Sequence, residues 1–362
     1  MAGFLMRSFD VNRLKETPLV AGSKERFNLW WTLLETALQT PSPHNVQPWR
    51  IRLVSEREAE LYIDGHRTLP KEDVTGSFIL SAMGMFIEAI ALLAAPRGFS
   101  LEYELSHPPQ WYTDTILHDN RSDLLPFARL QLSSGSPQES PYPESLFLKR
   151  RTSRINLWPT PIRETASTTL TELATRWGQR YQQIIDPEQI ENILAQNIDA
   201  LFQDLNTAAY HDEIVSWFRF TDRAAKRHRD GLDWRCMNTS RTAFRLAARI
   251  PRLLLFPVSR SLLRRQYRRQ LGLVPTIGIL AGEFFRAVSA FETGRFLIRF
   301  WLETAKLGLF IHPYGNLVTN PAAAKWMAET TNVKDIWLVF KIGYSEVPPK
   351  SYRRSLAEVM VY

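Results

Sequence analysis

The residue types best suited to bind a charged ligand lie in two short motifs about a hundred residues apart. The first is the segment Pro41–Trp49, with the sequence PSPHNVQPW, and the second is the cationic run Arg150–Arg154, with the sequence RRTSR. Arginine presents a planar fork of donors that matches phosphate oxygens, so the second motif suits a phosphate-bearing ligand. Taken alone, each motif also fits a simpler interpretation: a proline-rich turn that anchors a strand, and a solvated pair of arginines at a helix start.

Regular elements are expected on both sides of these motifs. Residues 26–39 place apolar side chains near helical spacing, and Pro41 ends that helix because its ring cannot continue it. The alternating segments that follow, 49–55 and 59–64, predict strands. Similar patterns predict helices at 163–177, 187–209, 211–228 and 294–309, and strands at 101–106, 128–134, 180–186, 274–281 and 336–343.

The longest apolar stretch covers residues 78–95, where only Glu88 is charged. Eighteen residues reach the minimum length of a membrane span. A charge at the centre of such a span costs about 2.5–3.5 kcal/mol, however, and a helix that is apolar all round is typical of a buried core. We therefore predict the central helix of the fold here.

Composition limits the function classes. The chain has 362 residues, 44% of them hydrophobic, and eleven Trp, which suffices for a large core and two modules. The single Cys236 excludes an intramolecular disulfide and a zinc site with several thiolates, and the seven His show no metal-ligand spacing. No glycine-rich phosphate loop follows a predicted strand. The Cys and His pattern thus predicts no metal site. The N-terminus lacks the apolar core of a signal peptide, so we expect a cytoplasmic protein.

The positive charge is concentrated in one segment. Residues 241–270 hold nine Arg and no acidic residue, so the other 332 residues carry −1 of the net charge of +8 (8 − 9). We therefore expect no nucleic-acid binding by the protein as a whole. Pro251 and Pro257 divide the segment into short helices. It suits a helical lid whose arginines pair with acids elsewhere, a basic amphipathic element that contacts anionic membranes, or a local contact for RNA or another polyanion.

The two motifs resemble those of a known family. PSPHNVQPW is similar to the PSxxNxQPW signature of the nitroreductase-like flavoproteins, and RRTSR is similar to that family's phosphate-binding RRSxR. Segments 63–84, 230–234 and 348–359 also resemble a subgroup of fused, double-length members, which includes mycobacterial proteins proposed to store flavin. The resemblance implies an α+β fold with FMN bound between two subunits. Each site would take the proline motif from one subunit and the arginine motif from the other.

The positions of the motifs then predict a pseudo-dimer in one chain. The first half carries the proline motif without RRSxR before it, and the second half carries RRTSR without PSxxNxQPW after it. One complete composite site is expected. A Ser-, Pro- and Gly-rich stretch at 133–145 is the clearest linker, so we divide the chain into residues 1–140 and 141–362. The resemblance also implies that the Arg-rich segment precedes the last core strand, where it can cover the flavin.

The resemblance also implies roles for particular residues. Arg150, Arg151 and Thr152 would contact the phosphate or ribityl chain, and the basic residues near the C-terminus would close over the phosphate. Arg154 would face the N1/C2 edge of the ring, where a cation stabilises reduced flavin. The proline motif would pack on the dimethylbenzene and ribityl side, with Gln47 bracing the loop. The full predicted cofactor set is Pro41, Ser42, Pro43, Asn45, Gln47, Arg150, Arg151, Thr152, Arg154, Lys350, Arg353 and Arg354.

Two functions fit this prediction. The first is an FMN oxidoreductase, a monomer or homodimer, that uses NADPH or NADH to reduce a small electrophile such as a nitroaromatic or quinone by ping-pong hydride transfer. No side chain is required as a catalytic acid or base, because the flavin carries the chemistry. The second is a flavin-sequestering protein whose lid blocks the reductant.

Overall fold

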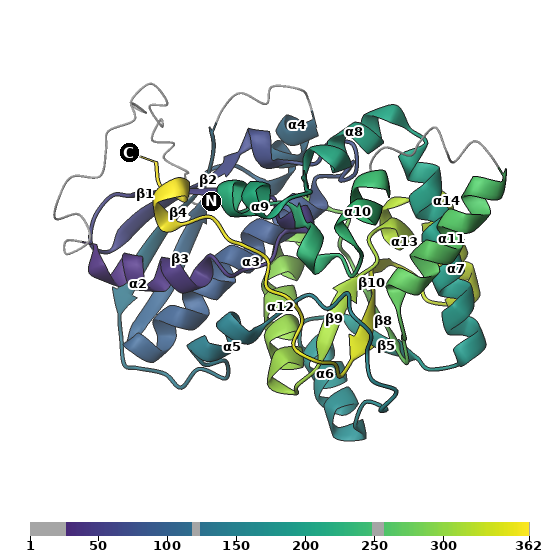
Figure 1. Ribbon diagram of the computed structural model, residues 1–362. Helices are drawn as coiled ribbons and strands as arrows, with labels where there is room; N and C mark the ends of the chain where they lie inside the picture. The colour runs from purple at the N-terminus through teal and green to yellow at the C-terminus, as the bar shows by residue number, and fades with distance from the viewer. Residues whose placement is uncertain (1–26, 118–123, 248–256, 362) are drawn as a thin grey trace.

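The computed structural model describes residues 27–117, 124–247 and 257–361. The fold is α+β, as predicted, and consists of two halves that lie side by side (Figure 1). Each half has a four-stranded antiparallel sheet, and two long helices, α3 (Ser77–Ala94) and α12 (Ala287–Lys306), lie between the sheets.

The first half contains the elements from α2 to β4. Their bounds are α2 Asn28–Ala37, η2 Pro43–Asn45, β1 Trp49–Leu53, β2 Glu58–Asp64, η3 Gly65–Arg67, α3 Ser77–Ala94, η4 Ala95–Arg97, β3 Phe99–Leu105, α4 Pro109–Leu117 and β4 Leu124–Ser134. The second half follows a short helix, α5 Glu144–Lys149. Its core elements are α6 Glu164–Arg176, β5 Arg180–Ile184, β8 Ile277–Ala281, α12 Ala287–Lys306, β9 Phe310–Pro313, α13 Asn316–Thr319, α14 Pro321–Thr331 and β10 Ile336–Gly343.

The halves repeat one topology. The strand order is β1-β2-β4-β3 in the first sheet and β5-β8-β10-β9 in the second, so the first, second, fourth and third strands of each half are neighbours. In both halves the long helix connects the second strand to the third. Each helix is followed by a left-handed glycine, Gly98 with φ 78° and Gly308 with φ 75°, that turns the chain into the next strand. The fold therefore contains an internal duplication.

The helix α3 is buried, as predicted. Its extended range Ser77–Arg97 is long and apolar enough to cross a membrane, but 83% of its apolar window is buried inside the protein. Glu88 is 1% exposed and accepts hydrogen bonds from Arg295 Nε at 2.9 Å and Arg299 Nε at 2.6 Å, both on α12. The one charge in the apolar stretch is thus paired across the junction of the halves, and the main hydrophobic core runs through both halves.

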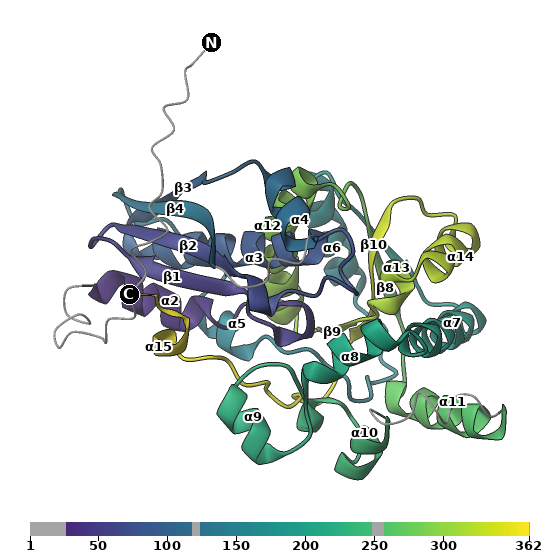
Figure 2. The same ribbon diagram turned by 90° about the horizontal axis from the view of Figure 1, so that it is seen from above.

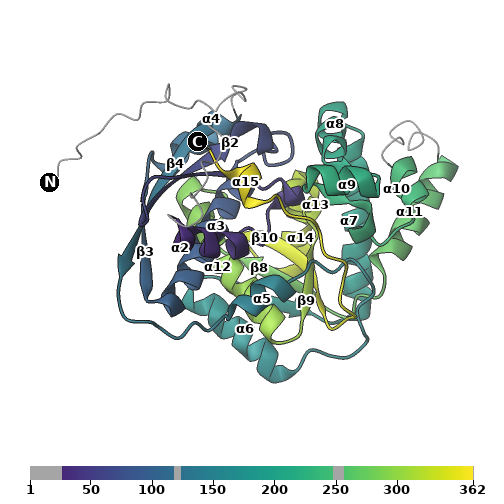
Figure 3. The same cartoon turned by 60° about the vertical axis from the view of Figure 1, so that its left-hand side comes forward.

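A long insert separates the first two strands of the second sheet. We call residues 185–276 the insert; its elements are α7 Pro187–Leu205, α8 Ala208–Ser216, β6 Phe218–Arg219, α9 Asp222–His228, β7 Leu232–Asp233, η5 Trp234–Cys236, α10 Arg241–Ala247 and α11 Pro257–Leu271. The corresponding β1–β2 connection in the first half is a tight hairpin. Figure 3 shows α7 and α11 on the side of the second sheet that lies away from the first sheet, whereas the end of α9 reaches the first half, where the Arg229 carbonyl accepts a hydrogen bond from Gln47 Nε2.

The chain end returns to the first half. We call residues 344–361 the C-terminal arm; it leaves β10, crosses the molecule and includes α15 Leu356–Val359 (Figure 2). Met360 forms a parallel bridge with Ile51 on β1, and Val361 N–H donates to the Ile51 carbonyl at 2.7 Å. The proposed division at residue 140 therefore separates two sheets, while the arm crosses back over it.

Several sequence predictions were wrong in detail. The Arg-rich segment precedes the second strand of the second sheet and not the last strand. The helix predicted at 294–309 begins earlier, at Ala287. Gly294 does not mark a helix boundary, since it lies inside α12 where the backbone of α3 comes close. The segment 211–228 is two helices, α8 and α9, with the short strand β6 between them, and the four-residue strand β9 was not predicted.

Candidate functional site

The proline loop, residues 40–48, connects α2 to β1 and has an unusual backbone. Three non-glycine residues, His44, Asn45 and Gln47, have positive φ angles of 42°, 57° and 52°. This left-handed region is sterically unfavourable for residues with a Cβ, although asparagine tolerates it. Gln47 N–H donates to Ser42 Oγ at 2.9 Å, which closes the loop on itself. Such strained segments persist where the surrounding structure holds them, and they are frequent at functional sites.

The C-terminal arm and the insert hold this loop in place. Gln47 is fully buried; its Oε1 accepts the backbone N–H of Arg354 at 2.8 Å, and its Nε2 donates to the Arg229 carbonyl at 2.9 Å. Asn45 Nδ2 donates to the Tyr352 carbonyl at 3.1 Å. Gln47 therefore braces the loop. Asn45 bonds to the arm through its nitrogen, and its Oδ1 is buried without a partner among the described residues.

The arginine motif lies against both halves. Thr152 forms an isolated parallel bridge with Ile311 of β9, and Ser153 N–H donates to the Ile311 carbonyl at 3.0 Å. Arg150 is only 6% exposed, and its Nη2 donates to the carbonyl of Gln39 at 3.1 Å, immediately before the proline loop. The structure thus brings the two sequence motifs together at the junction of the halves.

Four of the predicted cofactor residues form a cationic cluster: Arg150, Arg151, Lys350 and Arg353. Burial, followed by the nearby Arg353 and Arg151 guanidinium groups, holds the pKa of Arg150 well below its usual range. Burial and the three arginines of the cluster also lower the pKa of Lys350. Burial lowers the pKa of Arg353 to about 10, and Arg151 adds to this effect. None of the four cations forms an ion pair with a carboxylate in the described parts of the chain.

The cluster contains donors that lack acceptors. Arg150 Nη1, Arg151 Nε and Arg353 Nε are buried and have no hydrogen-bond partner within residues 27–117, 124–247 and 257–361. A buried charged donor without an acceptor is costly, and several like charges close together add repulsion. A phosphate dianion would supply both the acceptors and the opposite charge. This donor set therefore fits the phosphate end of a bound cofactor such as FMN.

The predicted residue Arg354 lies apart from the cationic cluster. Its guanidinium donates to the Gln47 carbonyl at 3.4 Å and also bonds the Glu358 carbonyl. Burial lowers the pKa of Arg354 to about 10, and the positive charges of Arg67 and Arg50 in the first half add to this effect. Arg354 thus fastens the C-terminal arm to the first half, whereas Arg353 belongs to the cluster.

Arg154, at the opposite end of the arginine motif from Arg150, lies beside Cys236 of the insert. Its Nη1 donates to the Cys236 carbonyl at 3.5 Å, and burial lowers the pKa of Arg154. Cys236 is buried as well, and burial raises the pKa of its thiol. His312 on β9 has its pKa held well below its usual range by burial, Arg154 and Lys341, so its imidazole is neutral.

A buried lysine positions the backbone of the arginine motif. Lys341 on β10 is fully buried, and its Nζ donates to the carbonyls of Arg154, Ile155 and Leu271 at 3.2, 2.8 and 3.1 Å. Burial and Arg154 lower the pKa of Lys341 to about 7. Lys341 was not predicted as a site residue, although a lysine inside an otherwise apolar strand is a recognisable signal of a buried functional or structural cation.

The insert also covers part of the proline loop. Arg67 Nη1 donates to the Val46 carbonyl and to Asp230 Oδ2, both at 2.9 Å. Asn45 exchanges hydrogen bonds with Gly231, whose N–H lies 3.2 Å from the Asn45 carbonyl. The segment 230–234, which resembles the family subgroup in sequence, therefore docks directly on the predicted site.

A second polar contact was not predicted from the sequence. His44 Nε2 contacts Glu72 Oε2, and Glu213 of the insert accepts the backbone N–H groups of Lys71 and Glu72 at distances from 2.9 to 3.1 Å. The positive charge of Arg154 acts to lower the pKa of His44, so the two residues lie in the same region. His44 therefore links the proline loop to the insert through Glu72.

The equivalent position in the second half has a different structure. The connection between α6 and β5 consists only of Trp177, Gly178 and Gln179, and Gly178 has φ 67°. A turn of this length has no room for a counterpart of the proline loop. The residues that would carry a counterpart of the arginine motif, before α2, lie outside the described residues. The second half therefore contributes the arginine motif to this junction without a proline loop of its own.

The Arg-rich segment pairs in part with acids of the insert. Arg264 Nη2 bonds Asp199 Oδ2 at 2.9 Å, and Arg268 Nε bonds Glu191 Oε2 at 2.9 Å, with both acids on α7. These pairs agree with the helical-lid hypothesis for residues 241–270, of which 248–256 lie outside the described residues.

Comparison with known proteins finds similar solved structures. No protein-family model and no curated protein matches the sequence. The similar structures include the FMN-dependent nitroreductase NfnB from Mycobacterium smegmatis in complex with NADPH, at 13% identity and a TM-score of 0.32, with 57% of this chain and 93% of that chain covered. A nitroreductase with bound FMN from Bacteroides fragilis is 10% identical, with a TM-score of 0.33 and coverages of 58% and 91%. A nitroreductase-like family protein from Bacillus cereus is 12% identical, with a TM-score of 0.32 and coverages of 58% and 89%.

Proposed function

We propose that this chain is a nitroreductase-like flavoprotein that binds FMN between the proline loop and the arginine motif. The cationic cluster would hold the phosphate, and Thr152 would contact the phosphate or the ribityl chain. Arg154 would face the ring, where a cation favours the negative charge of reduced flavin. On the opposite side, Pro41, Ser42, Pro43 and Asn45 would pack on the ring and ribityl chain.

One observation carries this proposal. Three buried guanidinium nitrogens, on Arg150, Arg151 and Arg353, lack acceptors in the described parts of the chain, and they lie within the motifs that resemble an FMN-binding family. A fold that only needed these residues for packing would gain from apolar replacements, because unpaired buried charge destabilises a protein. An anionic ligand accounts for their presence.

The proposed activity is NAD(P)H-dependent reduction of a small electrophile of the nitroaromatic or quinone type. When bound, FMN supplies the redox chemistry, because its ring accepts and donates hydride. The protein residues bind and orient it. Lys341 fixes the backbone of Arg154 and Ile155, and His312 is neutral, so its imidazole adds no charge beside Arg154.

A second function, flavin sequestration, is favoured by the docking of the insert. The side-chain nitrogens of Asn45 and Gln47 donate hydrogen bonds to the backbone carbonyls of Gly231 and Arg229, respectively. The insert thus covers the loop that would lie over the flavin. If this cover stays closed, the protein would bind FMN and exclude the reductant.

One experiment separates the two functions. The protein is purified, its absorbance spectrum is recorded, and NADPH is then added without oxygen. Bound FMN that bleaches near its visible band supports the oxidoreductase, and bound FMN that stays oxidised supports sequestration. A colourless protein that does not take up added FMN overturns the proposal. A cytoplasmic location, anionic-membrane contact by residues 241–270 and the choice between monomer and homodimer stay predictions from the sequence.

A further inference from the structure

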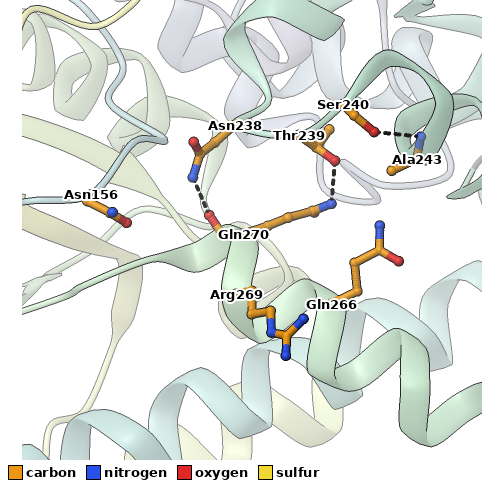
Figure 4. A pocket seen from close by; sticks show the side chains of 8 residues that line it. All are labelled: Asn156, Asn238, Thr239, Ser240, Ala243, Gln266, Arg269 and Gln270. Carbon is orange, nitrogen blue, oxygen red and sulfur yellow. Dashed lines mark hydrogen bonds between the residues drawn. The ribbon is translucent and has the colours of Figure 1, made fainter.

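The insert and Asn156 line an open, polar cavity with a volume of about 380 Å³. Figure 4 shows it between the turn that precedes α10 and the C-terminal end of α11. Ligand pockets typically measure about 300–1,000 Å³, so the cavity is large enough for part of a nucleotide. The residues that line it are Asn156, Asn238, Thr239, Ser240, Ala243, Gln266, Arg269 and Gln270.

Hydrogen bonds across the cavity hold its frame. Asn238 Nδ2 donates to the Gln270 carbonyl at 2.8 Å, and Gln270 Nε2 donates to Thr239 Oγ1 at 2.7 Å (Figure 4). Ser240 Oγ accepts the N–H of Ala243 at 3.2 Å, which begins α10. These bonds join two segments about thirty residues apart. The cavity therefore belongs to an organised part of the insert.

Two groups on the wall are free to bind a ligand. The Arg269 guanidinium and the Gln266 carboxamide make no hydrogen bond or ion pair with the rest of the described chain. No carboxylate lines the cavity. Donors without a negative charge nearby suit an anionic, oxygen-rich ligand.

Helix α11 carries further positive charge besides Arg269. Arg264 and Arg268 pair with acids of α7, whereas Arg260, Arg265 and Arg269 are exposed and have no acidic partner in the described residues. Like charges on one helix raise the local concentration of anions and speed their association. Among these free arginines, only Arg269 lines the cavity.

The cavity lies next to the proposed flavin site. Asn156 is two residues after Arg154, and Asn238 is two residues after Cys236, whose carbonyl accepts a hydrogen bond from Arg154. Two residues of chain span at most about 7 Å. A dinucleotide is longer than this, so one end could reach the flavin while the other occupies the cavity.

We propose that this cavity binds the phosphorylated ribose of the reductant and selects NADPH over NADH. The inference rests on the proposed oxidoreductase function. Proteins that bind the 2′-hydroxyl of NAD commonly use a carboxylate, whereas an arginine accommodates the 2′-phosphate of NADP. Arg269 supplies the cation, and the hydroxyls of Thr239 and Ser240 supply further hydrogen-bonding groups.

Calorimetric titration of the purified, FMN-loaded protein tests this proposal directly. The probes are adenosine 2′,5′-bisphosphate, adenosine 3′,5′-bisphosphate and 5′-AMP. The wild-type protein should bind the 2′,5′ compound about tenfold more tightly than the other two, since a charge-assisted hydrogen bond contributes about 1.5–3 kcal/mol. Arg269→Ala should remove this preference. Arg260→Ala, which removes an equal charge from the same helix outside the cavity, should change affinity less than twofold.

Several results would overturn the proposal. These are equal affinities for the three probes, no binding of the 2′,5′ compound, or equal losses in the two arginine variants, which would show only a diffuse field. A yellow protein that fails this titration overturns the cavity assignment and leaves the flavin proposal intact. A protein that never binds FMN overturns the proposed function, and its titration still decides whether the cavity binds the nucleotide fragment.

Discussion

Gly84 on α3 and Gly294 on α12 occupy equivalent positions on either side of the junction between the halves. A Cβ at Gly84 would lie 2.1 Å from the carbonyl oxygen of Phe291, and a Cβ at Gly294 would lie 2.1 Å from that of Ser81. In each helix the glycine is three residues after the carbonyl that its counterpart approaches. The contact is therefore reciprocal, and it agrees with the repeated strand order of the two sheets.

This relationship predicts a loss of stability on adding one methyl group at either glycine. Overpacking costs about 1–3 kcal/mol, while replacing glycine in a helix by alanine returns about 1 kcal/mol. Because the clash is with a backbone carbonyl and not with a movable side chain, the upper part of this cost applies, so Gly84→Ala and Gly294→Ala should each lower the free energy of unfolding by about 1–2 kcal/mol net. Gly135→Ala is the matched control, because nothing lies within 4 Å of a Cβ there. Urea unfolding measures all three, and unchanged midpoints for both helix variants would refute the close approach.

A second prediction concerns the pairing of Glu88 across the same junction. Glu88→Ala removes two charge-assisted hydrogen bonds to Arg295 and Arg299 and should destabilise the protein by about 2–3 kcal/mol. Glu88→Gln keeps the shape and part of the hydrogen bonding, so its loss should be smaller. Chemical unfolding curves compare the two variants with the wild type. Equal stability of Glu88→Ala and wild type would contradict a structural role for this pair.

The sequence predicted elements that rest on local patterns and missed those that rest on distant contacts. The strands β1, β2 and β10 have strong apolar patterns, and α3 is a long apolar run, so periodicity located them. The strand β9 has only four residues and is held by pairing with β10. The first turns of α12 were missed because Gly294 is typical of a helix boundary, whereas here it permits the approach of α3.

The site residues likewise divide into those recognisable from local sequence and those positioned by distant contacts. The proline and arginine motifs were recognisable because their residue types are distinctive, and the structure places them together through Arg150 and Gln39. Their supporting contacts were not predictable. The bonds of Gln47 to Arg229 and Arg354 join residues 182 and 307 positions apart. No local pattern carries such information, because it arises only when the insert and the arm dock.

A third prediction concerns the pH dependence of the loop contact. Burial lowers the pKa of His44, but the charge and hydrogen bond of Glu72 outweigh it, so the pKa is raised above 6.5; Arg154 opposes and Glu213 assists this shift. A raised pKa means that the stabilisation is fully present below the unfolded pKa of about 6.5 and is lost as pH rises through the folded value. His44→Asn removes the charge while asparagine tolerates the positive φ.

The measurement is the free energy of unfolding of wild type and His44→Asn across pH 5 to 9. The difference between them should be largest near pH 5 to 6 and should shrink above the folded pKa of His44. Glu72→Gln serves as the partner variant and should abolish the same pH-dependent part. A difference that stays constant over this range would exclude a protonated His44 in the folded protein.

The last prediction tests whether Arg150 binds the phosphate of FMN or only packs in the core. Arg150 lies 4.8 Å above the ring of Trp301, so its loss also removes packing. Riboflavin separates the two roles, because it has the flavin ring and ribityl chain of FMN without the phosphate. Arg150→Ala should weaken FMN binding by about 10- to 100-fold, the equivalent of one charge-assisted hydrogen bond, and leave riboflavin binding nearly unchanged. Lys149→Ala, an exposed neighbouring cation, should affect neither ligand.

Fluorescence titration of the flavin-free protein measures both affinities. A parallel loss for FMN and riboflavin would mean that Arg150 maintains the fold and that the phosphate is bound elsewhere.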